Sequence, residues 1–140
     1  MIFRYLKLLL VFFTLSSSLE AKTQFFKEGL IFYKKKNFEE AKFKFEQDLV
    51  LNPKSELSYL YLSKIFKNQK KKELEEQNLN TVILLNPRNE DAIYSLARLK
   101  LDSSDYKKSK ELNDKLMSLC DKFCDQSQKL KIEIENLSKK

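Results

Sequence analysis

Cys120 and Cys124 are the only two cysteines in this 140-residue chain, which contains no histidine. This donor set is too small for the common four-ligand zinc sites, so we expect no metal site. In an oxidising compartment an even cysteine count favours a bridge, and the pair predicts a disulfide that pins the C-terminal segment. Two free thiols are the alternative, because positions i and i+4 of a continuous helix suit bridge geometry poorly.

The remaining charged and polar residues do not form a recognisable catalytic centre. Adjacent carboxylates such as Glu39 and Glu40 lie near lysines, which is typical of a solvated helix face rather than of an acid and a base in different environments. Gly29 is the only glycine, so a glycine-rich phosphate loop cannot form. We therefore predict that the protein is not an enzyme and needs no cofactor.

The first 21 residues have the pattern of a signal peptide. Arg4 and Lys7 precede the apolar run at residues 8–15, which is too short to span a bilayer. Ala21 is a small residue that ends the segment. We expect export to the periplasm or the exterior with cleavage after Ala21, and an uncleaved anchor is the alternative.

The composition of the chain indicates long helices. Pro53 and Pro87 are the only prolines, and charged residues make up 34% of the chain. Scarce glycine and alanine beside plentiful lysine and asparagine suggest an AT-rich bacterial genome, which accounts for the net charge of +7. Because no arginine-rich stripe or base-reading motif is present, we expect no nucleic-acid partner.

The tripeptide Leu-Asn-Pro occurs at residues 51–53 and again at residues 85–87, so its copies are 34 residues apart. This period indicates two-helix units that bury their apolar faces by stacking. In the first unit, Gly29 stands where the two helices would pack closest, and Phe45 and Pro53 follow at the expected positions. With these residues the sequence resembles the tetratricopeptide-repeat (TPR) family.

The resemblance implies an all-α fold, a right-handed α-solenoid of three TPR helix pairs with a C-terminal capping helix. The TPR domain would cover residues 22–140. Asp48 and Glu75 depart from the family pattern, which has alanine at both positions. The implied parts are the repeats 22–55, 56–89 and 90–123 and the capping helix 124–138.

Family geometry also implies a concave groove lined by the first helix of each repeat. The apolar and basic residues at these positions suit an extended or helical peptide with apolar anchors and an acidic group. We therefore predict a protein-interaction scaffold of the bacterial cell envelope. The alternative is that packing or the cap covers the apolar positions. The predicted groove residues are Phe26, Leu30, Tyr33, Leu57, Leu60, Lys64, Lys67, Tyr94, Arg98 and Leu101.

Clustered lysines suggest a second function. They are all predicted to fall at the turn between the two helices of successive repeats, where they would form a lysine edge. Such an edge could contact anionic membrane or another envelope polyanion, at about 1 kcal/mol per lysine near an anionic surface. The alternative is ordinary solvated surface. The lysine edge consists of Lys34, Lys35, Lys36, Lys70, Lys71, Lys72, Lys107, Lys108 and Lys110.

Overall fold

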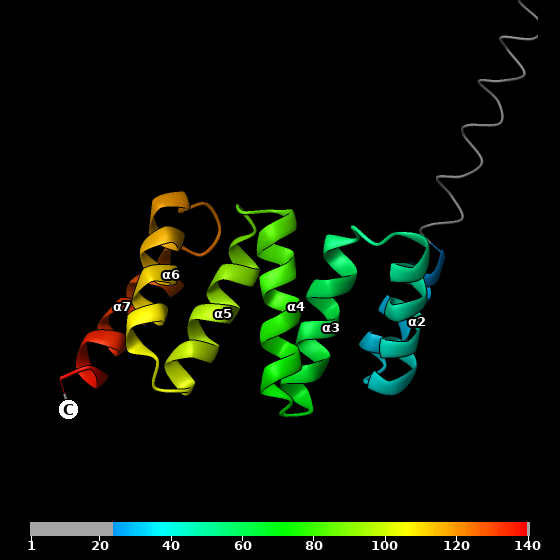
Figure 1. Cartoon of the computed structure of the whole chain (residues 1–140), viewed down its shortest axis with the longest axis horizontal. Helices are drawn as coiled ribbons and strands as arrows, with labels where there is room; N and C mark the ends of the chain where they lie inside the picture. The colour runs from blue at the N-terminus through cyan, green and yellow to red at the C-terminus, as the bar shows by residue number, and fades with distance from the viewer. Residues whose placement is uncertain (1–23, 140) are drawn as a thin grey trace, which may run out of the picture. The chain divides into compact units, whose positions relative to one another are not determined.

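The computed structural model describes residues 24–139, and every regular element among them is an α-helix (Figure 1). The chain divides into two compact units, Met1–Ser58 (unit 1) and Tyr59–Lys140 (unit 2), and the division falls inside α3 (Glu56–Asn68). The predicted signal peptide, residues 1–21, lies outside the described residues. No helix in the described part of the chain is long and apolar enough to cross a membrane.

Unit 1 contains a helical segment at residues 24–34 and helix α2 (Phe38–Leu51). Gly29 lies directly against the fully buried ring of Phe45. A Cβ atom at Gly29 would be only 2.7 Å from Cε1 of that ring. Gly29 is therefore a point of close packing between the two helices, in agreement with its predicted role.

Asp48 occupies an alanine position of the family pattern and is only 1% exposed. The hydroxyl of Ser58 donates a hydrogen bond to Asp48 Oδ2 at 2.5 Å, and the hydroxyl of Ser55 donates to Ser58 at 3.1 Å. A buried polar group must be hydrogen-bonded to be tolerated. Ser55 at the end of the first repeat and Ser58 at the start of the second therefore accommodate this departure from the family pattern.

Unit 2 contains the remainder of α3 and the helices that follow it. Helix α5 contacts α4, α6 and α7, and α6 contacts α7, so α5 is the centre of this unit (Figure 1). Helices α3, α5 and α7 begin at the predicted first residues of the second repeat, the third repeat and the cap. The bounds are α4 (Lys72–Leu85), α5 (Glu90–Asp102), α6 (Tyr106–Leu119) and α7 (Cys124–Leu137).

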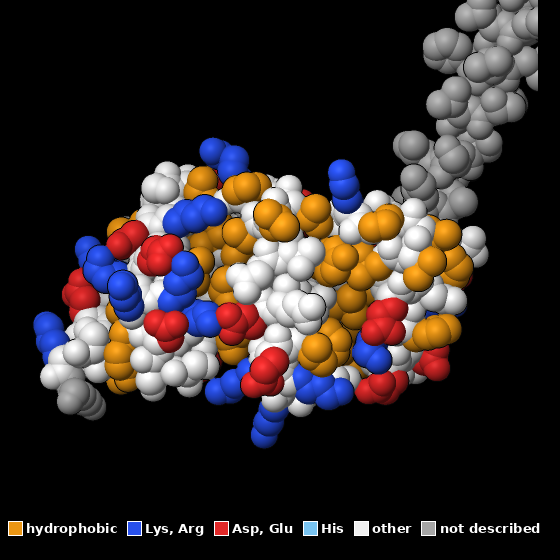
Figure 2. All heavy atoms as spheres, in the orientation of Figure 1, with side chains coloured by type: hydrophobic (Ala, Val, Ile, Leu, Met, Phe, Trp, Pro, Cys, Tyr) orange, Lys and Arg blue, Asp and Glu red, His pale blue; other side chains and the backbone are white. Residues whose placement is uncertain are grey.

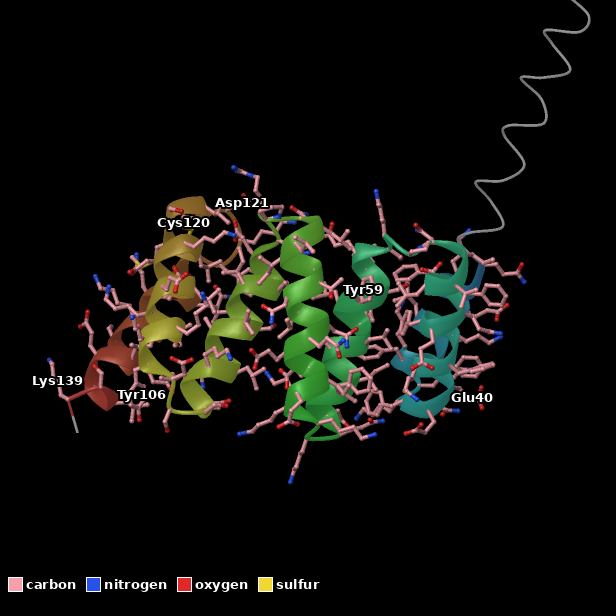
Figure 3. The ribbon with its side chains drawn as sticks, in the orientation of Figure 1. Glu40, Tyr59, Tyr106, Cys120, Asp121 and Lys139 are labelled. Carbon is pink, nitrogen blue, oxygen red and sulfur yellow. A yellow bond between two sulfur atoms is a disulfide. The ribbon has the colours of Figure 1, made fainter. Side chains whose placement is uncertain are left out.

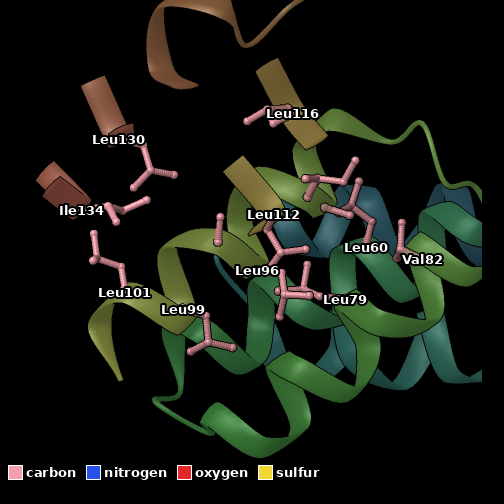
Figure 4. Packing of buried hydrophobic residues seen from close by; sticks show 13 residues of the cluster. Leu60, Leu79, Val82, Leu96, Leu99, Leu101, Leu112, Leu116, Leu130 and Ile134 are labelled. Atoms are coloured by element: carbon pink, nitrogen blue, oxygen red, sulfur yellow. The ribbon is translucent and has the colours of Figure 1, made fainter. Parts of the chain in front are cut away.

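The core of unit 2 is one continuous apolar cluster to which all of its helices contribute (Figure 4). Ser109 is buried beside this cluster and is paired: its hydroxyl donates a hydrogen bond to the carbonyl oxygen of Ala97 at 2.8 Å. The cluster consists of Leu60, Leu79, Val82, Ala92, Ile93, Leu96, Ala97, Leu99, Leu101, Leu112, Leu116, Leu130 and Ile134.

The second helix of each pair starts after a residue at the same repeat position. The side chain of Asn37 accepts a hydrogen bond from the backbone N–H of Glu40 at the start of α2. The side chain of Asp105 accepts one from the backbone N–H of Lys108 at the start of α6. Lys71 stands at this position before α4 and provides no side-chain cap. Because the first backbone N–H groups of a helix lack partners within the helix, α4 is the least well capped of the three.

We expect Lys71→Asp to stabilise unit 2 by about 1 kcal/mol, the usual contribution of an N-cap side chain. The aspartate would repeat the arrangement at Asp105. Thermal unfolding followed by circular dichroism measures the effect. Lys71→Ala is the matched control, since it removes the same charge without adding a cap. An equal gain from both variants would contradict the capping explanation.

Glu75, the second acidic residue at an alanine position of the family pattern, is buried in unit 2 with 4% exposure. It lies in a pocket of about 260 Å³ that is also lined by Lys67, Lys72 and Asp102. Burial raises the pKa of Glu75; Lys67 and Lys72 act in the opposite direction, and Asp102 adds to the rise. The folded state therefore holds the Glu75 proton more tightly than the unfolded chain does.

This difference predicts that Glu75 lowers the stability of the folded state as the pH rises through its ordinary pKa toward the raised value. Below the ordinary pKa the penalty is absent. We expect Glu75→Gln to remove this pH dependence and to stabilise the protein near neutral pH by an amount on the order of 1 kcal/mol. Urea unfolding at pH 4 and pH 7.5 tests this, with exposed Glu73→Gln as the control. A parent and variant with parallel pH profiles would contradict it.

Candidate functional site

Two residues of the predicted groove, Phe26 and Leu57, line one pocket of unit 1 with a volume of about 290 Å³. Leu57 is 50% exposed in the first turn of α3, and the ring of Phe26 packs on Phe45 with their centroids 5.6 Å apart. Apolar walls with a polar rim suit an apolar side chain of a peptide. The polar lining residues are Asp48, Asn52, Lys54, Ser55 and Glu56.

Leu30 and Tyr33 follow Phe26 by one and two helical turns on the segment at residues 24–34. Both side chains are half-buried. The ring of Tyr33 packs edge-on against the ring of Phe38, with the two ring centroids 5.6 Å apart. The three predicted residues of the first repeat therefore share one helix face, as residues spaced in this way must. This face leads to the pocket of unit 1.

Helix α2 exposes a second apolar surface in unit 1 that the sequence analysis missed. Phe43, Val50 and Leu51 are 53%, 80% and 46% exposed. Figure 2 shows hydrophobic side chains gathered over α2. The spacing of these residues could have revealed this surface. Val50 and Leu51 follow Phe43 by seven and eight residues, which places all three on one side of a helix.

Leu60 and Leu101 do not belong to an accessible groove. Both were predicted to face a partner, but they are 6% and 4% exposed and lie in the apolar cluster of unit 2. Leu101 is covered because α5 is packed against α4, α6 and α7, and Leu60 of α3 is buried in the same cluster. The alternative in which packing covers the apolar positions therefore holds for these two residues.

Two of the three basic groove residues already have acidic partners within unit 2. Lys64 Nζ lies 2.6 Å from Asp91 Oδ2 and 5.5 Å from the ring centroid of Tyr61. Arg98 is paired with Glu133 of α7, and burial alone would lower its pKa, but Glu133 raises it. A partner's acidic group would have to compete with these ion pairs.

Lys67, the third basic residue, is exposed. It lines the pocket that contains Glu75, at the end of α3. The structure therefore places Lys64, Lys67 and Arg98 in separate surroundings within unit 2 and does not assemble them into one site for an acidic group.

Tyr94 is half-buried beneath Phe123, with their ring centroids 5.3 Å apart. Phe123 belongs to the loop between α6 and α7. The predicted groove position of Tyr94 is therefore covered by an aromatic ring from the turn into the cap.

Glu90 holds this loop, a role that the sequence analysis did not predict. Its carboxylate accepts the backbone N–H groups of Asp121, Lys122 and Phe123 at 2.9, 2.8 and 2.9 Å. Burial on its own would raise the pKa of Glu90, but these three donors outweigh it and lower the pKa. The only sequence signal is that Glu90 is the first residue of its repeat, as Glu56 is of the one before.

Cys120 and Cys124 form a disulfide in the structure, with their Cα atoms 4.9 Å apart. The bridge spans the loop between α6 and α7, as Figure 3 shows from the position of Cys120 at the end of α6. The continuous helix that would have made bridging awkward is interrupted here, because Cys120 adopts φ 34° and ψ 67°. The disulfide and Glu90 thus act on the same loop.

The lysine edge is only partly located in turns. Lys35, Lys36, Lys70 and Lys71 lie between helices, whereas the other members lie within helices, which corrects their predicted placement. The reason is that each connection is short: a residue with positive φ at position 36, 70 or 104 ends the turn, and the next helix begins two residues later. The helical members are Lys34, Lys72, Lys107, Lys108 and Lys110.

Part of the lysine edge is neutralised by neighbours on its own helix. Lys108 Nζ lies 2.9 Å from Glu111, and Lys110 Nζ lies 2.8 Å from Asp114, which also raises the pKa of Lys110.

Among residues 24–139 there is no cluster of histidine, cysteine or acidic side chains that could hold a metal ion.

No family model and no curated protein matches the chain. Solved structures of TPR domains do match it. The Arabidopsis OM64 TPR domain has a TM-score of 0.74 and 16% identity, covering 85% of this chain and 98% of that one. The TPR2B domain of yeast Sti1, in complex with pHsp70, has a TM-score of 0.75 and 12% identity, covering 82% and 96%.

A bacterial structure matches equally well. The Yersinia enterocolitica type III secretion chaperone SycD, in complex with a peptide of the translocator YopD, has a TM-score of 0.74 and 13% identity, covering 85% of this chain and 93% of that one. At these identities the likeness concerns the fold. The chain therefore has the all-α solenoid fold of tetratricopeptide-repeat domains.

Proposed function

We propose that the chain is a protein-interaction scaffold that binds a partner peptide or protein and has no catalytic activity. The observation that carries this proposal is the pocket of unit 1, in which Phe26 and Leu57 present apolar surface inside a polar rim. Structural neighbours with the same fold bind peptides, including the YopD peptide bound by SycD. An apolar anchor of the partner would occupy the pocket.

The compartment of this scaffold is the bacterial cell envelope. The signal-peptide pattern at residues 1–21 supports export, and a disulfide fits an oxidising compartment. The internal pairing of Lys64 and Arg98 shifts the proposed partner chemistry from an acidic group toward apolar anchors.

Site-specific photocrosslinking in the producing cell tests this function. A benzophenone side chain at Leu57, 50% exposed beside the pocket, is expected to capture a discrete partner. The same group at Leu84, 81% exposed on α4, is the matched control. Failure to capture any partner at Leu57, or the same set of products from both positions, would exclude the pocket as the binding site.

The captured partner then allows a quantitative measurement. Phe26→Ala is expected to weaken its binding about tenfold or more, because truncating a buried anchor typically costs at least 1–2 kcal/mol. Val50→Ala, on the exposed surface of α2, should leave the affinity unchanged. Circular dichroism verifies that both variants keep their helicity.

The lysine edge supports a second candidate function, contact with anionic lipid or another envelope polyanion. Lys70, Lys71 and Lys72 are all exposed, and no acidic group among residues 24–139 lies within salt-bridge distance of them. Sedimentation with anionic and neutral vesicles tests this candidate. Equal binding to both vesicle types would rule out an electrostatic contact.

A further inference from the structure

We propose that Glu90 and the Cys120–Cys124 disulfide form a redox-sensitive latch that keeps Phe123 over Tyr94, and that reduction of the disulfide uncovers Tyr94. The latch itself needs no partner, and only its consequence for binding rests on the proposed function. A reduced chain would offer an additional aromatic residue to a partner, and an oxidised chain would withhold it.

The loop is held from two sides. At its base the disulfide joins Cys120, the last residue before the loop, to Cys124, the first residue of α7. From α5 the Glu90 carboxylate accepts the N–H groups of all three intervening residues, which are more than thirty positions away in the sequence. The two restraints therefore fix the same short stretch of backbone against α5.

The backbone at Cys120 shows which conformation the two restraints hold in place. Its φ of 34° and ψ of 67° lie in the left-handed region, which residues with a Cβ atom disfavour. This conformation ends α6 and turns the following N–H groups toward Glu90. Without the disulfide, Cys120 would be free to return to the right-handed region and withdraw those donors.

Phe123 connects the latch to the surface. It donates the third hydrogen bond to Glu90, and its ring lies 5.3 Å from the ring of Tyr94. The same loop borders a pocket of about 350 Å³ that is lined by Glu90 and by the turn before α5. There is thus open space beside the loop, and a loop released from Glu90 would carry Phe123 away from Tyr94.

The disulfide is accessible to a reductant because Cys120 is exposed. A small dithiol supplies the two electrons. Its thiolate attacks one sulfur of the bridge, which breaks the S–S bond, releases the other cysteine as a thiolate and gives a mixed disulfide. Its second thiolate then displaces the remaining protein sulfur from that mixed disulfide. The products are two cysteine thiols and the cyclic disulfide of the reductant, with the dithiol's two protons transferred to the cysteines.

Hydrogen exchange of the full chain, with and without dithiothreitol, tests the latch. We expect reduction to speed the exchange of the amides of residues 121–123 at least tenfold and to remove the nuclear Overhauser contacts between Phe123 and Tyr94. The amide of Ile93 in the core of unit 2 should keep its protection. In the double variant Cys120→Ser, Cys124→Ser, residues 121–123 should exchange as fast as in the reduced chain, and dithiothreitol should not change their rates.

Two results would overturn the proposal. The first is unchanged protection of residues 121–123 after thiol alkylation has shown complete reduction. The second is loss of protection at Ile93 together with the loop, which would show that the disulfide stabilises the whole of unit 2 rather than the loop alone.

Glu90→Gln tests the other half of the latch as a positioning residue. With the disulfide intact, this variant should lose at least tenfold of the exchange protection at residues 121–123, while exposed Glu111→Gln should behave as the parent does. Retained protection in Glu90→Gln would refute the role of Glu90. These readouts involve no partner, so a negative result here would not argue against partner binding in the pocket of unit 1. Failure to capture a partner at Leu57 would likewise not argue against the latch, which could still be measured.

Discussion

Replacing Gly29 with leucine is expected to disrupt unit 1, with a loss of about 3 kcal/mol or more. A Cβ atom alone would approach two carbons of the Phe45 ring to 2.7 and 2.8 Å, which is closer than packed atoms tolerate. Phe45 is fully buried and also contacts Phe26, so its ring has little space into which it can move. Urea unfolding followed by circular dichroism, with hydrogen exchange of α2, measures the loss.

Two variants separate steric conflict from other effects of the substitution. Lys27→Leu, at an exposed position of the same helical segment, introduces the same side chain without meeting Phe45 and should change stability little. In the background of Phe45→Ala, Gly29→Leu should cost much less than in the parent. Equal costs in both backgrounds would show that the close approach of Gly29 and Phe45 is not what limits this position.

The close packing at Gly29 could be predicted from the sequence because each repeat encodes its own local packing. The period of 34 residues predicted helices that begin at Glu56 and Glu90, and both begin there. These features depend on residues within one helix pair, where spacing along the chain determines which side chains meet. The start of α7 at Cys124 follows from the same phase.

The candidate site was harder to predict because its residues are covered by elements distant in the sequence. Leu101 is buried in a helix contacted by α4, α6 and α7, and Arg98 is engaged by Glu133 of the cap. Glu90 binds a loop more than thirty residues away through backbone N–H groups, which carry no side-chain signature. Family geometry can predict which face of a helix lines the groove. It cannot predict which residues of that face remain accessible after the capping helix has packed.

The two acidic residues at alanine positions of the family pattern illustrate a related limit. Asp48 and Glu75 are both buried at positions where the family has alanine. Asp48 is hydrogen-bonded by Ser58, whereas Glu75 lies in a pocket with lysines and has a raised pKa. The sequence marks both as exceptions, but only the partners distinguish a satisfied carboxylate from one that costs stability.

The substitution Ile93→Ala is expected to destabilise unit 2 by about 2–5 kcal/mol, the usual cost of removing a buried isoleucine side chain beyond its Cβ. Ile93 has no exposed surface and lies within the apolar cluster, on the helix that contacts α4, α6 and α7. Leu84→Ala is the matched control, since Leu84 is 81% exposed and should lose less than about 0.5 kcal/mol. Urea unfolding compares the two.

Hydrogen exchange of Ile93→Ala then shows how far the damage spreads. Because α6 and α7 both pack on α5, their amides should lose protection together with those of α5. Repeat proteins are stabilised mainly by neighbouring units, so amides of α2, which belongs to unit 1, should lose much less. An equal loss of protection in α2 and α6 would instead show that residues 24–139 unfold as one cooperative body, and the Gly29→Leu variant would then have to expose α6 as readily as α2.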